Sequence, residues 1–176
     1  MIKKKKKTAG IISYIAVFII IGMFVVKTVN FHTDGSLFKD GMYTLYDNTT
    51  TYNLDVEKGK MVPGTNIRFY EPSPGENWQR FYIAYDGDGV YYIYCGDGSV
   101  CVGASFLSDN VLTQRSVQSE WQKWKIERIG SSELYWITNV YTGKALKIVE
   151  NEDGSMNAVV AELDKNDESF KIKIKR

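Results

Sequence analysis

A twelve-residue pattern that occurs three times is the feature that most constrains how this chain can fold. Its copies are Tyr43–Leu54, Tyr91–Val102 and Tyr135–Leu146, and their starts are 48 and 44 residues apart. In each copy a tyrosine comes first, an aliphatic residue third and another aliphatic residue twelfth, with polar turn-forming residues between them. Alternating side chains on either side of a turn predict a β-hairpin that returns an aliphatic residue to the core.

Each repeat also closes with a similar segment. The clear copies are Trp78–Ile83 and Trp121–Ile126, and Asp167–Ile172 is a weaker third copy. The shared features are a polar second residue (Gln79, Gln122, Glu168) and an aromatic residue two positions later (Phe81, Trp124, Phe170). Three copies that run to the end of the sequence favour a closed three-fold structure over an open array. We expect one domain over residues 41–176, with lobes at about 41–87, 88–131 and 132–176.

Together these motifs resemble the ricin B-type β-trefoil lectin family. The resemblance rests on the repeated Gln-x-aromatic segments and on Tyr-x-Ile-x-Asn-x-x-Thr-Gly-Lys-x-Leu at 135–146. It implies an all-β fold, a β-trefoil with pseudo-threefold symmetry. Phe81, Trp124 and Phe170 would then be large apolar side chains of a shared core. Gln79 and Gln122 would belong to the scaffold, because buried amides need hydrogen-bond partners.

The resemblance also implies sugar binding, with a carboxylate directly after the aliphatic residue that ends the twelve-residue pattern. That position is Asp55 in the first lobe, Gly103 in the second and Lys147 in the third. We therefore expect a site in lobe one, formed by Asp55 as acceptor, Arg68 as polar helper, Tyr70 as stacking aromatic and Trp78 as a second stacking surface. The family's galactose-binding lobes have Asn before the Gln, so Trp78 leaves the specificity open. Asp55 as an ordinary strand-end carboxylate is the alternative.

The first thirty residues predict a membrane anchor. Lys3–Lys7 are followed by Ala9–Val26, eighteen residues without a charge, which as a helix span about 27 Å, close to the thickness of the bilayer core. Basic flanks stay in the cytoplasm. We expect a cytoplasmic segment at 1–8, one transmembrane α-helix at 9–26 in the lipid bilayer, a stalk at 27–40 and an extracytoplasmic domain. A cleaved signal peptide is the alternative, although no Ala-x-Ala site follows the apolar run.

Net charge and the single histidine limit the functions expected of the exported part. It has 16 basic and 21 acidic residues after His32, a net charge of −5 that disfavours nucleic acid as a partner. His32 is the only histidine, so histidine-based catalytic triads and common zinc sites are not expected. We predict no cofactor, no metal and no enzymatic activity.

Cys95 and Cys101 are the only cysteines and flank a Gly-Asp-Gly turn. Outside the cell such a pair can cross-link a hairpin. The sequence therefore predicts a disulfide between them, with two free thiols as the alternative.

The predicted function is a membrane-anchored, extracytoplasmic, carbohydrate-binding module without catalysis, with a glycan as its partner. The alternative is a degenerate trefoil that binds an envelope protein or acts as a spacer, because two of the three lobes lack the acid.

Overall fold

The computed structural model describes residues 35–96 and 98–176, which form twelve strands and four short 3-10 helices. The strands of the first third of this region are β1 (Gly41–Asp47), β2 (Asn53–Val56), β3 (Ile67–Tyr70) and β4 (Phe81–Gly87). They are followed by β5 (Val90–Cys95), β6 (Val100–Ala104), β7 (Val111–Arg115) and β8 (Lys123–Arg128). The last four are β9 (Leu134–Asn139), β10 (Ala145–Glu150), β11 (Met156–Ala161) and β12 (Ile172–Lys175). The 3-10 helices are η1 (Glu57–Gly59), η2 (Asn77–Gln79), η3 (Glu120–Gln122) and η4 (Glu168–Phe170).

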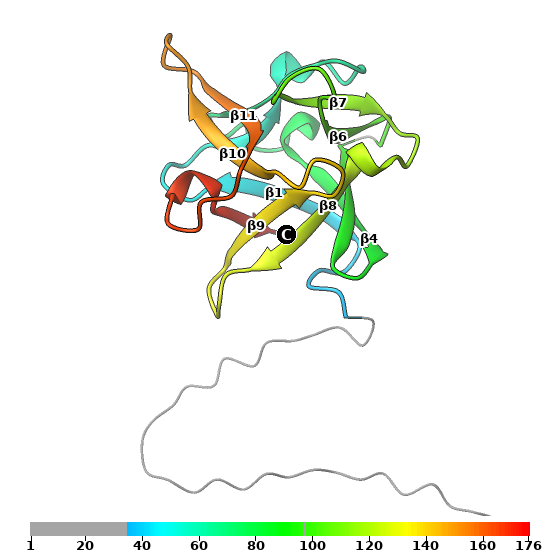
Figure 1. Ribbon diagram of the computed structural model, residues 1–176. Helices are drawn as coiled ribbons and strands as arrows, with labels where there is room; N and C mark the ends of the chain where they lie inside the picture. The colour runs from blue at the N-terminus through cyan, green and yellow to red at the C-terminus, as the bar shows by residue number, and fades with distance from the viewer. Residues whose placement is uncertain (1–34, 97) are drawn as a thin grey trace, which may run out of the picture.

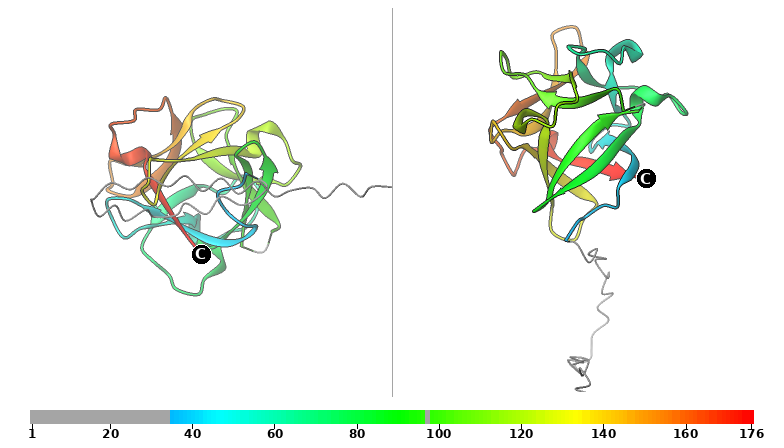
Figure 2. Two further views of the ribbon diagram at one scale, coloured as in Figure 1. Left: turned by 90° about the horizontal axis from the view of Figure 1, so that it is seen from below. Right: turned by 90° about the vertical axis from the view of Figure 1, so that its right-hand side faces the viewer.

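Six of these strands close into an antiparallel barrel. The pairing runs β1–β4–β5–β8–β9–β12 and returns from β12 to β1. The other six strands form three hairpins, β2–β3, β6–β7 and β10–β11, that cap one end of the barrel (Figure 1). Seen from below, the strands surround a central axis (Figure 2). This is a β-trefoil, so the all-β fold class expected from the repeats is confirmed.

The cap is tied together near the pseudo-threefold axis by three asparagines at equivalent positions. Asn66 donates to Asn157 (2.9 Å), and Asn157 donates to Asn110 (3.2 Å). Each of these positions lies two residues before the partner of Asp55, Gly103 or Lys147 in its hairpin. These two hydrogen bonds connect residues from the hairpins of all three lobes.

The barrel core repeats with the expected symmetry, except in the third closing segment. Tyr43 pairs with Phe81 and Tyr91 with Trp124, but Tyr135 pairs with Ile172. Phe170 is buried, yet it ends η4 as Gln79 ends η2. The alignment of Phe170 with Phe81 and Trp124 was therefore wrong by two residues.

The lower end of the barrel is filled by a residue that the sequence placed in the stalk. Phe38 is only 8% exposed. Its ring lies 5.4 Å from that of Tyr43, 5.9 Å from that of Tyr91 and 5.0 Å from that of Tyr135, measured between centroids. These three tyrosines begin the three repeats. The domain therefore starts before residue 41, and the final residues of the predicted stalk are part of its core.

The predicted cytoplasmic segment, transmembrane helix and first part of the stalk (1–34) lie outside the described residues. Within residues 35–96 and 98–176, no helix has the length and apolarity needed to cross a bilayer.

The predicted disulfide is not formed in the structure, which describes both Cys95 and Cys101 and shows no bond between them. Both thiols are buried, but Cys101 pairs with Tyr94, so Cys95 faces the opposite side of the hairpin. Cys95 belongs to the hydrophobic core, as do Val100 and Val102 on either side of Cys101. Strand alternation therefore points the two sulfurs away from each other.

Candidate functional site

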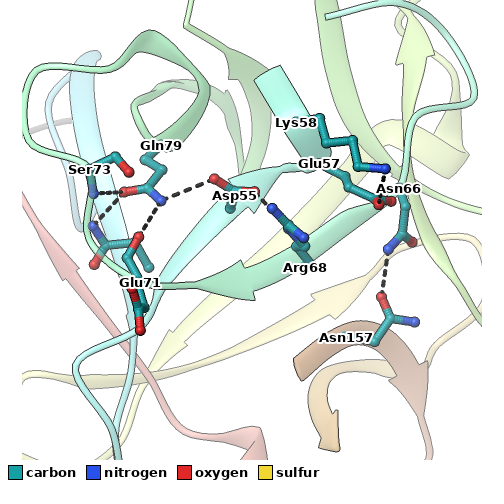
Figure 3. A network of polar contacts seen from close by, with 10 residues as sticks. Asp55, Glu57, Lys58, Asn66, Arg68, Glu71, Ser73, Gln79 and Asn157 are labelled. Carbon is teal, nitrogen blue, oxygen red and sulfur yellow. Dashed lines mark hydrogen bonds and ion pairs between the residues drawn. The ribbon is translucent and has the colours of Figure 1, made fainter. Parts of the chain in front are cut away.

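In lobe one the carboxylate that was predicted to bind a sugar is buried. Asp55 on β2 lies opposite Arg68 on β3. One carboxylate oxygen accepts from Arg68 Nε (2.9 Å) and the other from Gln79 Nε2 (3.0 Å) (Figure 3). Asp55 is 1% exposed. Both oxygens therefore have partners inside the protein.

Gln79 is the centre of this network. Its Nε2 also donates to the backbone oxygen of Glu71 (2.8 Å), and its Oε1 accepts from Ser73 N (2.7 Å) and Asn53 Nδ2 (3.1 Å). These bonds fasten the segment after β3 to the hairpin (Figure 3). Since every polar atom of the amide is engaged, the structure places Gln79 in the scaffold.

Arg68 also covers the predicted stacking surface. Its guanidinium carbon lies 4.0 Å from the centroid of the Tyr70 ring, whose residue is 45% exposed. Trp78 packs over Gly59, where an added Cβ would lie 2.9 Å from the indole. The structure thus brings Asp55, Arg68 and Tyr70 together, as predicted. Arg68, however, binds the carboxylate of Asp55 and covers one face of the Tyr70 ring.

Lobe two builds the same scaffold with a neutral amide. A Cβ at Gly103 would lie 2.4 Å from Gln114 Cδ, so the Gln114 side chain fills the space above this glycine. Gln122 Nε2 donates to Gln114 Oε1 (3.2 Å) and to the backbone oxygen of Arg115 (2.7 Å). Val117 N donates to Gln122 Oε1 (3.1 Å). Gln114 therefore takes the place that Asp55 has in lobe one.

Beside this scaffold lies an open groove of about 360 Å³. Its aromatic wall is formed by Trp121 and Phe106, whose rings meet edge to face at 6.2 Å. Tyr141 stacks on Trp121 with ring centroids 3.8 Å apart and supports it from outside the groove lining. The other residues that line the groove are Pro63, Gly64, Ser105, Leu112, Thr113, Gln114, Arg115, Val117, Ser119 and Gln122.

This groove was not predicted from the sequence, because lobe two lacks the carboxylate on which the predicted sugar site was based. Its aromatic residues come from three separate segments: the β6–β7 loop, η3 and the β9–β10 turn. The available signal was Trp121, an aromatic residue directly before Gln122. An aromatic wall above engaged amides can stack on the C–H face of a sugar ring, as aromatic faces do with apolar surfaces.

Lobe three has no comparable site. Phe170 replaces the glutamine at the end of the 3-10 helix, and Lys147 Nζ lies 5.0 Å from its ring centroid. Lys147 also pairs with Asp167 (3.0 Å). Hydrogen bonds from Ser169, together with Lys147, lower the pKa of Asp167 to about 2. The position that could hold a ligand is thus closed by an ion pair over an apolar ring.

Metal binding has no candidate in the described part of the chain. No three His, Cys, Asp or Glu side chains gather there closely enough to hold an ion.

The fold and the three equivalent scaffold positions define the class of protein: a β-trefoil with an open, aromatic-walled groove in lobe two. Comparison with known proteins agrees with this class. The model of the family described as "Ricin-type beta-trefoil lectin domain-like" matches residues 77–161. No curated protein sequence matches the chain.

Solved structures similar to this chain share its fold. ThreeFoil, a designed 3-fold symmetric protein, has 21% identity and a TM-score of 0.70, covering 78% of this chain and 99% of ThreeFoil. A Polyporus squamosus lectin bound to a human-type influenza-binding epitope has 14% identity and a TM-score of 0.66, covering 78% of this chain and 49% of that one. A mutant of the earthworm lectin C-terminal domain in complex with 6'-sialyllactose has 16% identity and a TM-score of 0.58, covering 76% of this chain and 97% of that one.

Proposed function

We propose that this chain is a non-catalytic carbohydrate-binding module that binds a glycan in the groove of lobe two. The observation that carries the proposal is the wall formed by Trp121 and Phe106 beside the Gln114–Gln122 scaffold. A sugar ring presents a weakly apolar C–H face that stacks on such a wall. Its hydroxyl groups then meet the polar residues along the groove, among them Ser105 and Ser119.

Similar proteins support this class of ligand. The Polyporus squamosus lectin and the mutant earthworm lectin domain were solved with glycans bound. The family model that matches residues 77–161 describes lectin-like domains. The proposal for this chain extends these likenesses to its own groove.

We further propose that residues 9–26 anchor the module in a membrane, with the domain outside the cytoplasm. Eight residues, 27–34, lie between this span and the described domain, and they reach at most about 29 Å. Phe38 fills the lower end of the barrel, whereas the groove is built from the β2–β3 loop, hairpin β6–β7 of the cap and the segment from β7 through η3. The groove would then face away from the membrane. Many copies on one surface would raise the overall avidity, although the affinity of each shallow site is weak.

A second candidate function is binding of an envelope protein, because the same region exposes apolar side chains. Phe106 is 72% exposed and Leu107 84%, and Val117 and Tyr141 are also exposed. Exposed apolar clusters often mark protein interfaces. On this reading the groove would hold an apolar side chain of the partner rather than a sugar.

The test is an array of immobilised glycans probed with the full chain in a detergent that has no sugar headgroup. We expect binding to a defined group of glycans by the cooperatively folded protein. In parallel, cross-linking in intact cells would show whether an envelope protein contacts Phe106 or Leu107. A blank array together with a specific cross-linked partner would replace the sugar proposal with the second candidate.

A further inference from the structure

In each lobe a cation lies at or near the candidate ligand position, and in lobes one and three this cation is neutralised internally. In lobe one Arg68 pairs with Asp55 (2.9 Å), and in lobe three Lys147 pairs with Asp167 (3.0 Å). In lobe two the cation is Arg115, exposed at the end of β7. Its side chain has no ion pair or hydrogen bond with any residue in 35–96 or 98–176. Lobe two alone therefore leaves its cation available.

Arg115 is also the only charged residue that lines the groove. The remaining lining residues are apolar or neutral, and no carboxylate is among them. A groove of this composition has nothing to accept a cation, and its one charge calls for an anion. Guanidinium groups bind carboxylates through two parallel hydrogen bonds, which makes the pairing directional as well as electrostatic.

The amides of the groove cannot replace this interaction. Gln122 donates to Gln114 and to the backbone of Arg115, and its oxygen accepts from Val117. Gln114 Nε2 donates to the backbone oxygen of Ala104 (2.8 Å). Because these groups hold the scaffold, few side chains are left to recognise the hydroxyl pattern of a neutral sugar.

We infer that the lobe-two groove selects a sugar that carries a carboxylate, with the sugar ring on Trp121 and Phe106 and the carboxylate on Arg115. This inference rests on the proposed function and names the class of glycan. The domain as a whole is acidic, at −5 after His32, so general electrostatic attraction does not draw an anion to it. Selectivity must come from the local pair and should weaken as salt screens it.

The experiment compares matched sugars that differ only in the acid. Methyl glucuronide is compared with methyl glucoside, and a sialylated trisaccharide with its carboxyl-reduced form, by ligand-observed NMR on the full chain in a detergent without sugar headgroups. We expect the acid of at least one pair to bind about fivefold more tightly than its neutral counterpart at low salt, the range of an exposed ion pair. Arg115→Gln should remove that preference. Arg80→Gln, an exposed arginine outside this groove, should keep it.

The possible failures are distinguishable. If both members of each pair bind equally, or if Arg115→Gln retains the preference, the inference is overturned while sugar binding stands. If no glycan binds to the folded chain, the proposed function fails and the inference fails with it. Loss of the preference in both arginine variants would assign it to overall charge and would also overturn the inference.

Discussion

The position directly after each twelve-residue pattern, within β2, β6 or β10, shows how one residue changes the use of a lobe. Asp55 is buried and accepts hydrogen bonds from both Arg68 and Gln79. Gly103 leaves a space that Gln114 fills, and Lys147 forms an ion pair with Asp167. The same backbone position thus has a buried anion, no side chain and a cation in the three lobes. A carboxylate at this position is therefore not by itself a sugar ligand, because its surroundings decide whether it is exposed.

Replacing Asp55 tests whether its buried carboxylate stabilises the fold. Asp55→Ala leaves Arg68 and Gln79 without their acceptor in a buried place, so we expect a loss of about 3 kcal/mol in the free energy of unfolding. The measurement is urea denaturation. Asp109→Ala, which removes an exposed pair with Lys144, should leave the free energy of unfolding close to that of the wild type. If Asp55→Ala unfolds like the wild type but no longer binds glycans, Asp55 is a ligand residue after all.

The two cysteines give a second prediction at this scale. Burial raises the pKa of Cys101 to about 12, and Cys95 is buried in the core. The thiolate is the reactive form, so we expect both thiols to resist iodoacetamide in the folded protein and to react once it is unfolded in denaturant. The readout is intact mass after labelling, with and without prior reduction. Labelling of the unfolded protein that requires reduction would reveal a disulfide and contradict the structure.

Among the elements, η4 departs most from its two counterparts. Asp167 precedes it and accepts hydrogen bonds from Ser169 N (2.9 Å) and Ser169 Oγ (2.7 Å). This turn places Phe170 where the other lobes have glutamine, and it brings Ile172 opposite Tyr135. The third lobe therefore keeps the backbone of the repeat while its polar scaffold is replaced by an apolar one.

The charge of Asp167 should make part of the stability depend on pH. Its folded pKa of about 2 lies below the value of the unfolded chain, so its contribution is present above about pH 4 and is lost as the pH falls toward 2. Asp167→Asn keeps an N-cap acceptor but not the charge. We expect it to be less stable than the wild type at neutral pH and to approach the stability of the wild type as the pH falls below 2, measured by thermal unfolding. Glu152→Gln, in the exposed β10–β11 turn, is the control and should follow the wild type throughout.

The three main hairpins could be predicted from the sequence because alternation and turn residues are local signals. The third closing segment was misaligned because Phe170 resembles Phe81 in type, whereas strand pairing with Tyr135 decides the register. Phe38 was missed because one apolar residue in a non-periodic segment gives no local signal. The disulfide prediction was wrong because strand alternation points Cys95 and Cys101 to opposite faces of the hairpin. The groove depends on tertiary contact between Phe106, Trp121 and Tyr141.

For the whole molecule, a symmetric scaffold supports one asymmetric site. The cap is tied by Asn66, Asn110 and Asn157, and the lower end of the barrel is filled by Phe38, which contacts the first tyrosine of each repeat. These features stabilise all three lobes alike. The aromatic-walled groove of the described residues lies in lobe two, so we expect one glycan per chain and weak binding by a single copy.

The most direct test of this account uses the two tryptophans that occupy the same position in lobes one and two. A glycan that binds on the array is titrated by calorimetry into the wild type, Trp121→Ala and Trp78→Ala, all as full chains that unfold cooperatively. Loss of a stacking aromatic costs about 1 to 3 kcal/mol, so the account predicts at least about fivefold weaker binding for Trp121→Ala. Trp78→Ala should bind within about twofold of the wild type. The opposite result, with binding lost in Trp78→Ala and kept in Trp121→Ala, would place the site in lobe one and contradict the account.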